Sequence, residues 1–143
     1  MDSEYIRIKE WPTEHAQKAY DSKNYIEAMQ VLHGWIENKL QELLILTGSI
    51  DFKMDSSKTW DIANQVSYIN AARVLFILSQ ITETEYQKII KFNSLRNQII
   101  HKVFHEPYKK AYKGIPRAEY DNVFEQGKEL ADLLQYKTEL KIE

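Results

Sequence analysis

The chain of 143 residues contains no cysteine. This absence excludes disulfides, thiolate nucleophiles and zinc sites built on thiolates. Long hydrophobic runs are also missing, and the densest one, residues 74–78, is far too short to span a bilayer. The first residues include Asp2 and Glu4 and lack the apolar segment of a secretory signal. We therefore expect a soluble cytoplasmic protein.

Glycine and proline are scarce, with four and three residues, and they lie between long segments of helical periodicity. No segment alternates for long enough with the two-residue period of a strand. We predict a single all-α domain over residues 1–143, folded as an antiparallel bundle of four to five helices. Helices are expected at 13–20, 24–47, 61–79, 82–104 and 116–140, with a polar loop at 48–59 and a basic loop at 105–115.

Apolar periodicity and capping signals give these helices more detail. The second helix should end at Gly48, since glycine commonly follows the last helical turn. The third is apolar nearly all round in its second half, which predicts a central position or a subunit contact. Thr82 and Glu85 form a capping-box pattern at the start of the fourth. Residues expected to face the core from the second and last helices are Tyr25, Met29, Leu32, Ile36, Leu40, Leu43, Tyr120, Val123, Leu130 and Leu134.

Charge is distributed unevenly along the chain. The net charge is −2, but residues 88–117 contain eight Lys or Arg and a single acid, Glu106. That segment is therefore locally +7, and the remainder of the chain is −9. A basic pole of this kind suits a polyanionic ligand. A solvated basic helix end fits the same pattern, because Lys and Arg favour helix C-termini.

The basic segment contains a motif suited to phosphodiester chemistry, formed by Arg96, Asn97 and His101 late in the fourth helix. Cleavage of RNA needs a base for the 2′-hydroxyl, stabilisation of the pentacoordinate phosphate and an acid for the 5′-oxygen. His101 is the candidate base, because imidazole titrates near neutral pH. Arg96 could grip phosphate oxygens, and Asn97 could orient the ribose or the imidazole. This scheme requires no metal ion and no cofactor.

The phrase Leu95-Arg96-Asn97-x-x-x-His101, near the end of a later long helix, resembles the signature of the HEPN domains. A short helix followed by a long one opening with Asn-Tyr-Ile-Glu-Ala (24–28) extends the resemblance over nearly the whole chain. The resemblance implies a metal-independent endoribonuclease that leaves 2′,3′-cyclic phosphate ends. It also implies a toxin of a toxin–antitoxin or antiphage system, a homodimer, and a possible cognate antitoxin of nucleotidyltransferase or other type.

Two residues depart from the family pattern. Many HEPN toxins paired with nucleotidyltransferases carry a tyrosine two residues after the histidine, where this chain has Val103. His105 is an additional imidazole one turn further on, and a second acid could come from it. The alternative function is a HEPN-like module that binds a protein or nucleotide partner without cleaving RNA, because one scaffold can host both behaviours.

A helical wheel of the fourth helix separates a core face from a polar stripe. Arg96 lies about 140° around the axis from His101, so spacing alone does not put the two on one face. The stripe is flanked by Ile90 and Phe104, which a monomer would leave against solvent. We therefore expect a two-fold contact across this helix, joining two copies of the motif in one cleft. The predicted core face is Phe92, Leu95, Ile99 and Val103, and the stripe is Asn93, Asn97, His101 and His105.

Other residues form weaker patterns. Cations and aromatics interleave after the motif, which suits bases stacked over a phosphate track, although an exposed loop explains the pattern equally well. His33 and Glu37 share a helix face and are interpreted as a surface hydrogen-bonded pair. His101 and His105 are too few ligands for a metal. The three tryptophans, at positions 11, 35 and 60, are expected in the core or an interface. Candidate RNA-binding residues are Lys102, His105, Tyr108, Lys109, Lys110 and Lys113.

Overall fold

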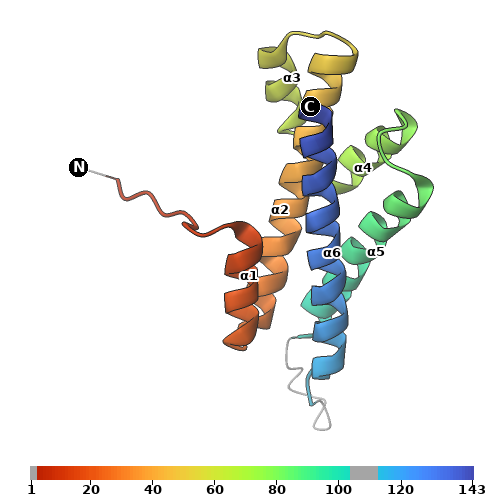
Figure 1. Ribbon diagram of the computed structural model, residues 1–143. Coiled ribbons are helices and arrows are strands. Elements are labelled where there is room, and N and C mark those ends of the chain that lie inside the picture. Colours follow the sequence, from red (N-terminus) through yellow and green to blue (C-terminus); the bar gives the residue numbers. More distant parts are fainter. Residues whose placement is uncertain (1–2, 104–112) are drawn as a thin grey trace.

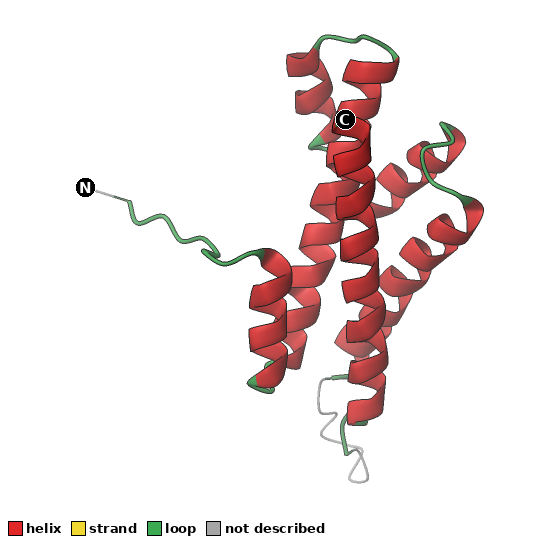
Figure 2. Cartoon of the chain, viewed as in Figure 1, coloured by secondary structure: helices red, strands yellow, loops and turns green. Residues whose placement is uncertain are grey.

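The computed structural model describes residues 3–103 and 113–143, and every regular element in that part of the chain is helical (Figures 1 and 2). The all-α prediction is confirmed. The α-helices number six rather than four or five, because the predicted third helix is divided in two. The elements are α1 Pro12–Asp21, α2 Tyr25–Leu46, the π-helical turn η1 Thr47–Asp51, α3 Ser56–Ala63, α4 Tyr68–Ile77, α5 Glu83–Lys102 and α6 Arg117–Ile142.

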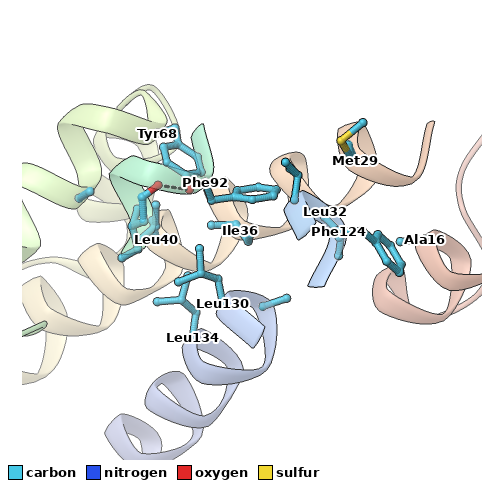
Figure 3. Packing of buried hydrophobic residues seen from close by; sticks show 14 of the residues in the cluster. Ala16, Met29, Leu32, Ile36, Leu40, Tyr68, Phe92, Phe124, Leu130 and Leu134 are labelled. Carbon is cyan, nitrogen blue, oxygen red and sulfur yellow. Dashed lines mark hydrogen bonds between the residues drawn. The ribbon is translucent and has the colours of Figure 1, made fainter. Parts of the chain in front are cut away.

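The two longest helices, α2 and α6, form the most extensive contact and lie side by side along the molecule (Figure 1). They run in the same direction, whereas α1 and α2 are antiparallel, as are α5 and α6. Side chains of α2, α5 and α6 converge on one core, in which Ile36, Phe92 and Leu134 are fully buried (Figure 3). Of the ten residues predicted to face this core, all are buried except Tyr25, which packs against it partly exposed. None of the described helices is both long enough and apolar enough to cross a bilayer.

Gly127 marks the point where α6 comes closest to its neighbours. A Cβ atom at this position would lie 2.6 Å from Cε2 of Phe92 on α5 and 2.9 Å from Cδ1 of Leu32 on α2. Real Cβ atoms do not approach so closely, and both neighbouring side chains are fully buried. The missing side chain therefore allows three helices to pack together at the level of the core.

The segment around Gly48 differs from the prediction. Gly48 does not end the second helix, because the backbone continues from α2 into η1. Its Cβ would lie 2.8 Å from Cγ2 of Thr59, so a side chain here would collide with α3. The predicted 48–59 loop was therefore too long, and it contains η1 and the first residues of α3.

The predicted helix 61–79 is interrupted between α3 and α4. The hydroxyl of Ser67 accepts a hydrogen bond from the amide of Asn70 at 3.4 Å, which caps a new helix start. Within α4 only one side of the apolar second half is covered: Leu75 is fully buried, whereas Ile77 is 77% exposed. The helix lies at the edge of the bundle, so the prediction of a central position was wrong. Trp60, on α3, is also more than half exposed and is not a core residue.

The helix that carries the motif starts where the sequence predicts. The Thr82 hydroxyl accepts from the Glu85 amide at 3.1 Å, and the Glu85 carboxylate accepts from the Thr82 amide at 2.8 Å, so the capping box is confirmed. Phe92 and Ile99 are buried, and Leu95 packs against the core. The predicted core face of α5 is therefore correct, and it fixes which way the motif residues point.

Candidate functional site

Four polar residues of α2 connect this helix to α5 and to the start of α4. They recur at helical spacing, three and then four residues apart, and so share one side of α2. Each makes a hydrogen bond to a residue outside α2, and together we call them the polar seam. Its members are Gln30, His33, Glu37 and Gln41.

Arg96 is held by the seam and by its neighbour in sequence. The Gln30 Oε1 atom accepts from Nε of Arg96 at 2.9 Å and from Nη2 at 2.5 Å. Asn97 accepts from Nη1 at 2.7 Å. A guanidinium has five N–H groups, so two remain to grip phosphate oxygens. The Arg96 side chain is only partly buried, which leaves these groups within reach of a ligand.

His33 forms the middle of the seam. Its Nε2 donates to Oδ1 of Asn93 at 2.8 Å, and its ring stacks on Tyr68 with centroids 4.5 Å apart. Burial lowers the pKa of His33; the bond to Asn93 opposes this shift and the charge of Arg96 adds to it. His33 is therefore neutral at neutral pH. It positions Asn93 and adds no second cation beside Arg96.

Tyr68 and Glu37 anchor the seam to the first turn of α4. The Tyr68 hydroxyl donates to the carbonyl of Ile89 at 2.8 Å, and burial raises its pKa, so it stays protonated. The Glu37 carboxylate accepts from the Tyr68 amide at 2.9 Å. Glu37 thus caps α4 instead of pairing with His33, and the predicted surface pair is wrong. Glu37 instead pairs with Tyr68 and His33 with Asn93, and each partner lies more than thirty residues away in sequence.

His101 differs from Arg96 in being exposed on the last turn of α5. No hydrogen bond or ion pair ties its ring to another described residue. Lys102 and Lys113 are exposed as well, on the two sides of the connection between α5 and α6. The other proposed RNA-binding residues lie outside the described part of the chain: His105, Tyr108, Lys109 and Lys110.

Arg96 and Asn97 are hydrogen-bonded to each other, and His101 follows one turn after Asn97 on the same helix. Within the described residues, no hydrogen bond connects His101 to either. A single copy therefore offers a fixed cation beside an amide and, further around the same helix, an exposed imidazole. Such a surface can bind phosphate and accept or donate a proton, but it does not assemble both functions at one point.

The burial of α5 removes part of the argument for a dimer. Ile90 is partly buried against the core of its own chain, so it does not need a second copy to cover it. Asn93 is hydrogen-bonded to His33 of α2 in the same chain, and Asn97 accepts from its neighbour Arg96 on α5. Phe104 lies outside the described residues. Among the stripe residues that the structure describes, only His101 is exposed, and Asn93 and Asn97 are partly buried.

Residues of the seam were not identified from the motif. Gln30 holds Arg96 by two hydrogen bonds, where Asn97 makes one, and His33 holds Asn93 on the neighbouring turn of α5. A signal for them exists in the recurrence of polar residues along α2, at positions 30, 33, 37 and 41. That recurrence shows which side of α2 is polar, but not which helix it meets.

Metal-binding groups do not gather in this region. Within residues 3–103 and 113–143, no three His, Asp or Glu side chains are close enough together to hold a metal ion. Comparison of the chain with protein-family models, with characterised proteins and with solved structures found no match. The resemblance to the HEPN domains therefore rests only on the residues of this chain: Arg96 and Asn97, five and four residues before His101, near the end of a long helix in an all-α bundle.

Proposed function

We propose that this protein is a metal-independent endoribonuclease of HEPN type, acting in the cytoplasm as the toxin of a toxin–antitoxin or antiphage system. One observation supports this most strongly. Arg96 is fixed by Gln30 and Asn97 with two N–H groups unused, on the same helix as the exposed His101. A preorganised cation and a solvent-accessible imidazole are two of the groups that phosphodiester cleavage requires.

The reaction proceeds by transfer of the phosphoryl group within the RNA. His101 takes the proton of the 2′-hydroxyl, the 2′-oxygen attacks phosphorus, and the bond to the 5′-oxygen breaks. The leaving 5′-oxygen receives a proton from an acid, giving a 2′,3′-cyclic phosphate and a 5′-hydroxyl. Arg96 holds two non-bridging oxygens and stabilises the added charge of the pentacoordinate phosphate.

We propose that two copies share the cleft, because one copy keeps Arg96 and His101 on different sides of α5. In a two-fold dimer the imidazole of one chain can face the guanidinium of the other. Each of the two sites then combines the guanidinium of one chain with the imidazole of the other. The basic residues around the connection of α5 and α6, including Lys102 and Lys113, would track the flanking phosphates.

The alternative is a module that binds a nucleotide or a protein partner and cleaves nothing. The separation of Arg96 from His101 favours it, since an arginine with two free N–H groups binds a phosphate without any acid or base. On this alternative the partner would include a cognate antitoxin, and His101 would be dispensable.

A cleavage assay with purified protein separates these functions. We expect RNA cleavage in the presence of EDTA, and His101→Ala should lower its rate by at least ~100-fold. Gln87→Ala, an exposed residue of the same helix, is the control and should retain full activity. Undiminished cleavage by His101→Ala, or complete inhibition by EDTA, would refute the mechanism. Binding of RNA or nucleotide without cleavage would favour the alternative.

Mixing two inactive variants tests whether chains share the cleft. If each site combines Arg96 of one chain with His101 of the other, a mixed dimer of Arg96→Ala and His101→Ala has one intact site. Random exchange of subunits should then restore about a quarter of wild-type activity. If one chain supplies both residues, the mixture stays inactive, and the shared cleft is refuted while the cleavage chemistry can still hold.

A further inference from the structure

The first described residues, 3–9, form an arm that leaves the body of the molecule before α1 (Figure 1). Two of its apolar side chains have almost no contact with their own chain: Tyr5 is 93% exposed and Ile6 is 89% exposed. Two large apolar side chains in succession at this exposure favour a surface that is covered in a larger assembly.

An open groove on α2 lies where the arm begins. It has a volume of about 430 Å³ and a mainly apolar lining, to which Ile8 of the arm contributes. Among the described residues that line it, Glu27 is the one that carries a charge. The other lining residues are Pro12, Gln30, Val31, Gly34 and Trp35. A groove with an apolar floor and one acid suits an apolar segment with basic side chains.

The arm has that composition. Arg7 and Lys9 alternate with Ile6 and Ile8, so an extended arm presents bases on one side and branched apolar side chains on the other. Neither base forms an ion pair or hydrogen bond with any described residue. The extended arm and the open groove are therefore complementary in shape, in hydrophobicity and in charge.

The arm is poorly suited to fill the groove of its own chain. Ile8 already lines that groove in its own chain, and the arm extends away from the body of the molecule (Figure 1). To return, the chain would have to reverse direction within residues 3–8, a stretch without Gly, Pro, Asn or Asp, the residues that favour tight turns. Extended, the same six residues reach about 20 Å from the body, at about 3.3 Å per residue.

We propose that the arm of one chain docks in the α2 groove of a second copy, and that the two copies exchange arms. Each chain then supplies one arm and one groove, which closes the assembly with two-fold symmetry. Because Gln30 lines the groove and also holds Arg96, the exchanged arm of one chain lies beside the candidate site of the other. This inference does not depend on RNA cleavage.

The absence of cysteine makes a direct test possible with the full-length chain. One variant carries Ile6→Cys in the arm, and the other carries Gly34→Cys in the groove. A side chain added at Gly34 meets no atom within 4 Å, so the thiol should not disturb the helix. A disulfide needs Cα atoms within about 7 Å, so it reports docking.

An equal mixture of the two single variants can form a 6–34 disulfide only between chains. At about 10 µM protein, docking gives an effective thiol concentration in the millimolar range, so the mixed covalent dimer should form roughly 100-fold faster than in a control mixture. The control pairs Ile6→Cys with Tyr136→Cys, an exposed residue of α6 outside the groove.

Each outcome decides the proposal. A covalent dimer in the Ile6→Cys and Gly34→Cys mixture, absent from the control and from each variant alone, supports arm exchange. Equal cross-linking in both mixtures, or none, overturns it. A chain that carries both cysteines and closes them within itself, leaving a covalent monomer, also overturns it and assigns the groove to the chain's own arm.

Discussion

Gln30→Leu is the most informative single substitution for the candidate site, because Gln30 touches Arg96 without belonging to the motif. The change removes the acceptor of two hydrogen bonds, from Nε and from Nη2 of Arg96. Hydrogen bonds to a charged group contribute about 1.5–3 kcal/mol when buried. Gln30 is exposed, so solvent weakens these bonds. We expect the two hydrogen bonds together to contribute about 1–2 kcal/mol to the orientation of Arg96, and Gln30→Leu to remove this contribution.

That loss converts to a rate because Arg96 is proposed to act on the transition state. A loss of about 1–2 kcal/mol lowers kcat/KM about 5- to 30-fold. Asn38→Leu is a matched control, since Asn38 is another exposed amide of α2 and has no hydrogen-bond partner among the described residues. It should cleave RNA at the wild-type rate, and both variants should unfold at similar temperatures.

A double-mutant cycle shows whether Gln30 acts through Arg96. Arg96→Ala should be strongly impaired, and adding Gln30→Leu to it should produce no further loss, because no guanidinium remains to be positioned. If Gln30→Leu lowers kcat/KM by the same factor in both backgrounds, Gln30 acts independently of Arg96. If Gln30→Leu is fully active alone, the two hydrogen bonds have no part in function.

Two further predictions concern stability. Gly127→Ala adds a Cβ that collides with fully buried side chains, and overpacking of about 1–3 kcal/mol should outweigh the better helix propensity of alanine, so the unfolding temperature should fall. The Cβ of Gly34→Ala meets no other atom, so its unfolding temperature should rise. Equal shifts in the two variants would contradict the packing around Gly127. The pKa of His15 is raised by hydrogen bonds to Glu27 and Glu10. A raised folded pKa stabilises the fold fully below the unfolded value and loses this effect as pH rises through the folded value. His15→Gln should therefore destabilise more at about pH 6 than at about pH 8.5, and a pH-independent difference in unfolding temperature would show that these contacts do not form.

Helical periodicity was sufficient to predict the faces that build the core. Apolar residues such as Leu32, Ile36 and Leu134 recur at helical spacing, and burial of that stripe is what stabilises an amphipathic helix. The start of α5 was also predictable, since Thr82 and Glu85 satisfy each other locally. Both signals are contained within one or two turns of sequence.

The division between α3 and α4 could not be read from the sequence in the same way. Residues 64–67 contain no glycine or proline, and the new helix starts because Ser67 caps it and Glu37 accepts the Tyr68 amide. Glu37 comes from α2, so part of the signal lies far away in the chain. Local propensity therefore favoured one continuous helix where tertiary hydrogen bonds favour two.

The motif of the candidate site could be predicted from the sequence, but the residues that hold the motif in position could not. Arg96, Asn97 and His101 stand within six residues, but Gln30 is 66 positions from Arg96 and His33 is 60 positions from Asn93. Polar spacing along α2 identifies the side that carries such residues. Only the packing of α2 against α5 identifies their partners.

Because the chain is synthesised from its N-terminus, the late position of α6 in the sequence affects when the candidate site can assemble. Leu32, Ile36 and Leu40 of α2 are synthesised well before α6, the helix that makes the most extensive contact with α2. Until α6 has been made, α2 lacks this contact and α5 lacks one of the surfaces on which it rests. A nascent chain that already contains Arg96 and His101 therefore does not yet hold them in their final positions. For a protein that cleaves RNA, the site would be assembled only after α6 has left the ribosome.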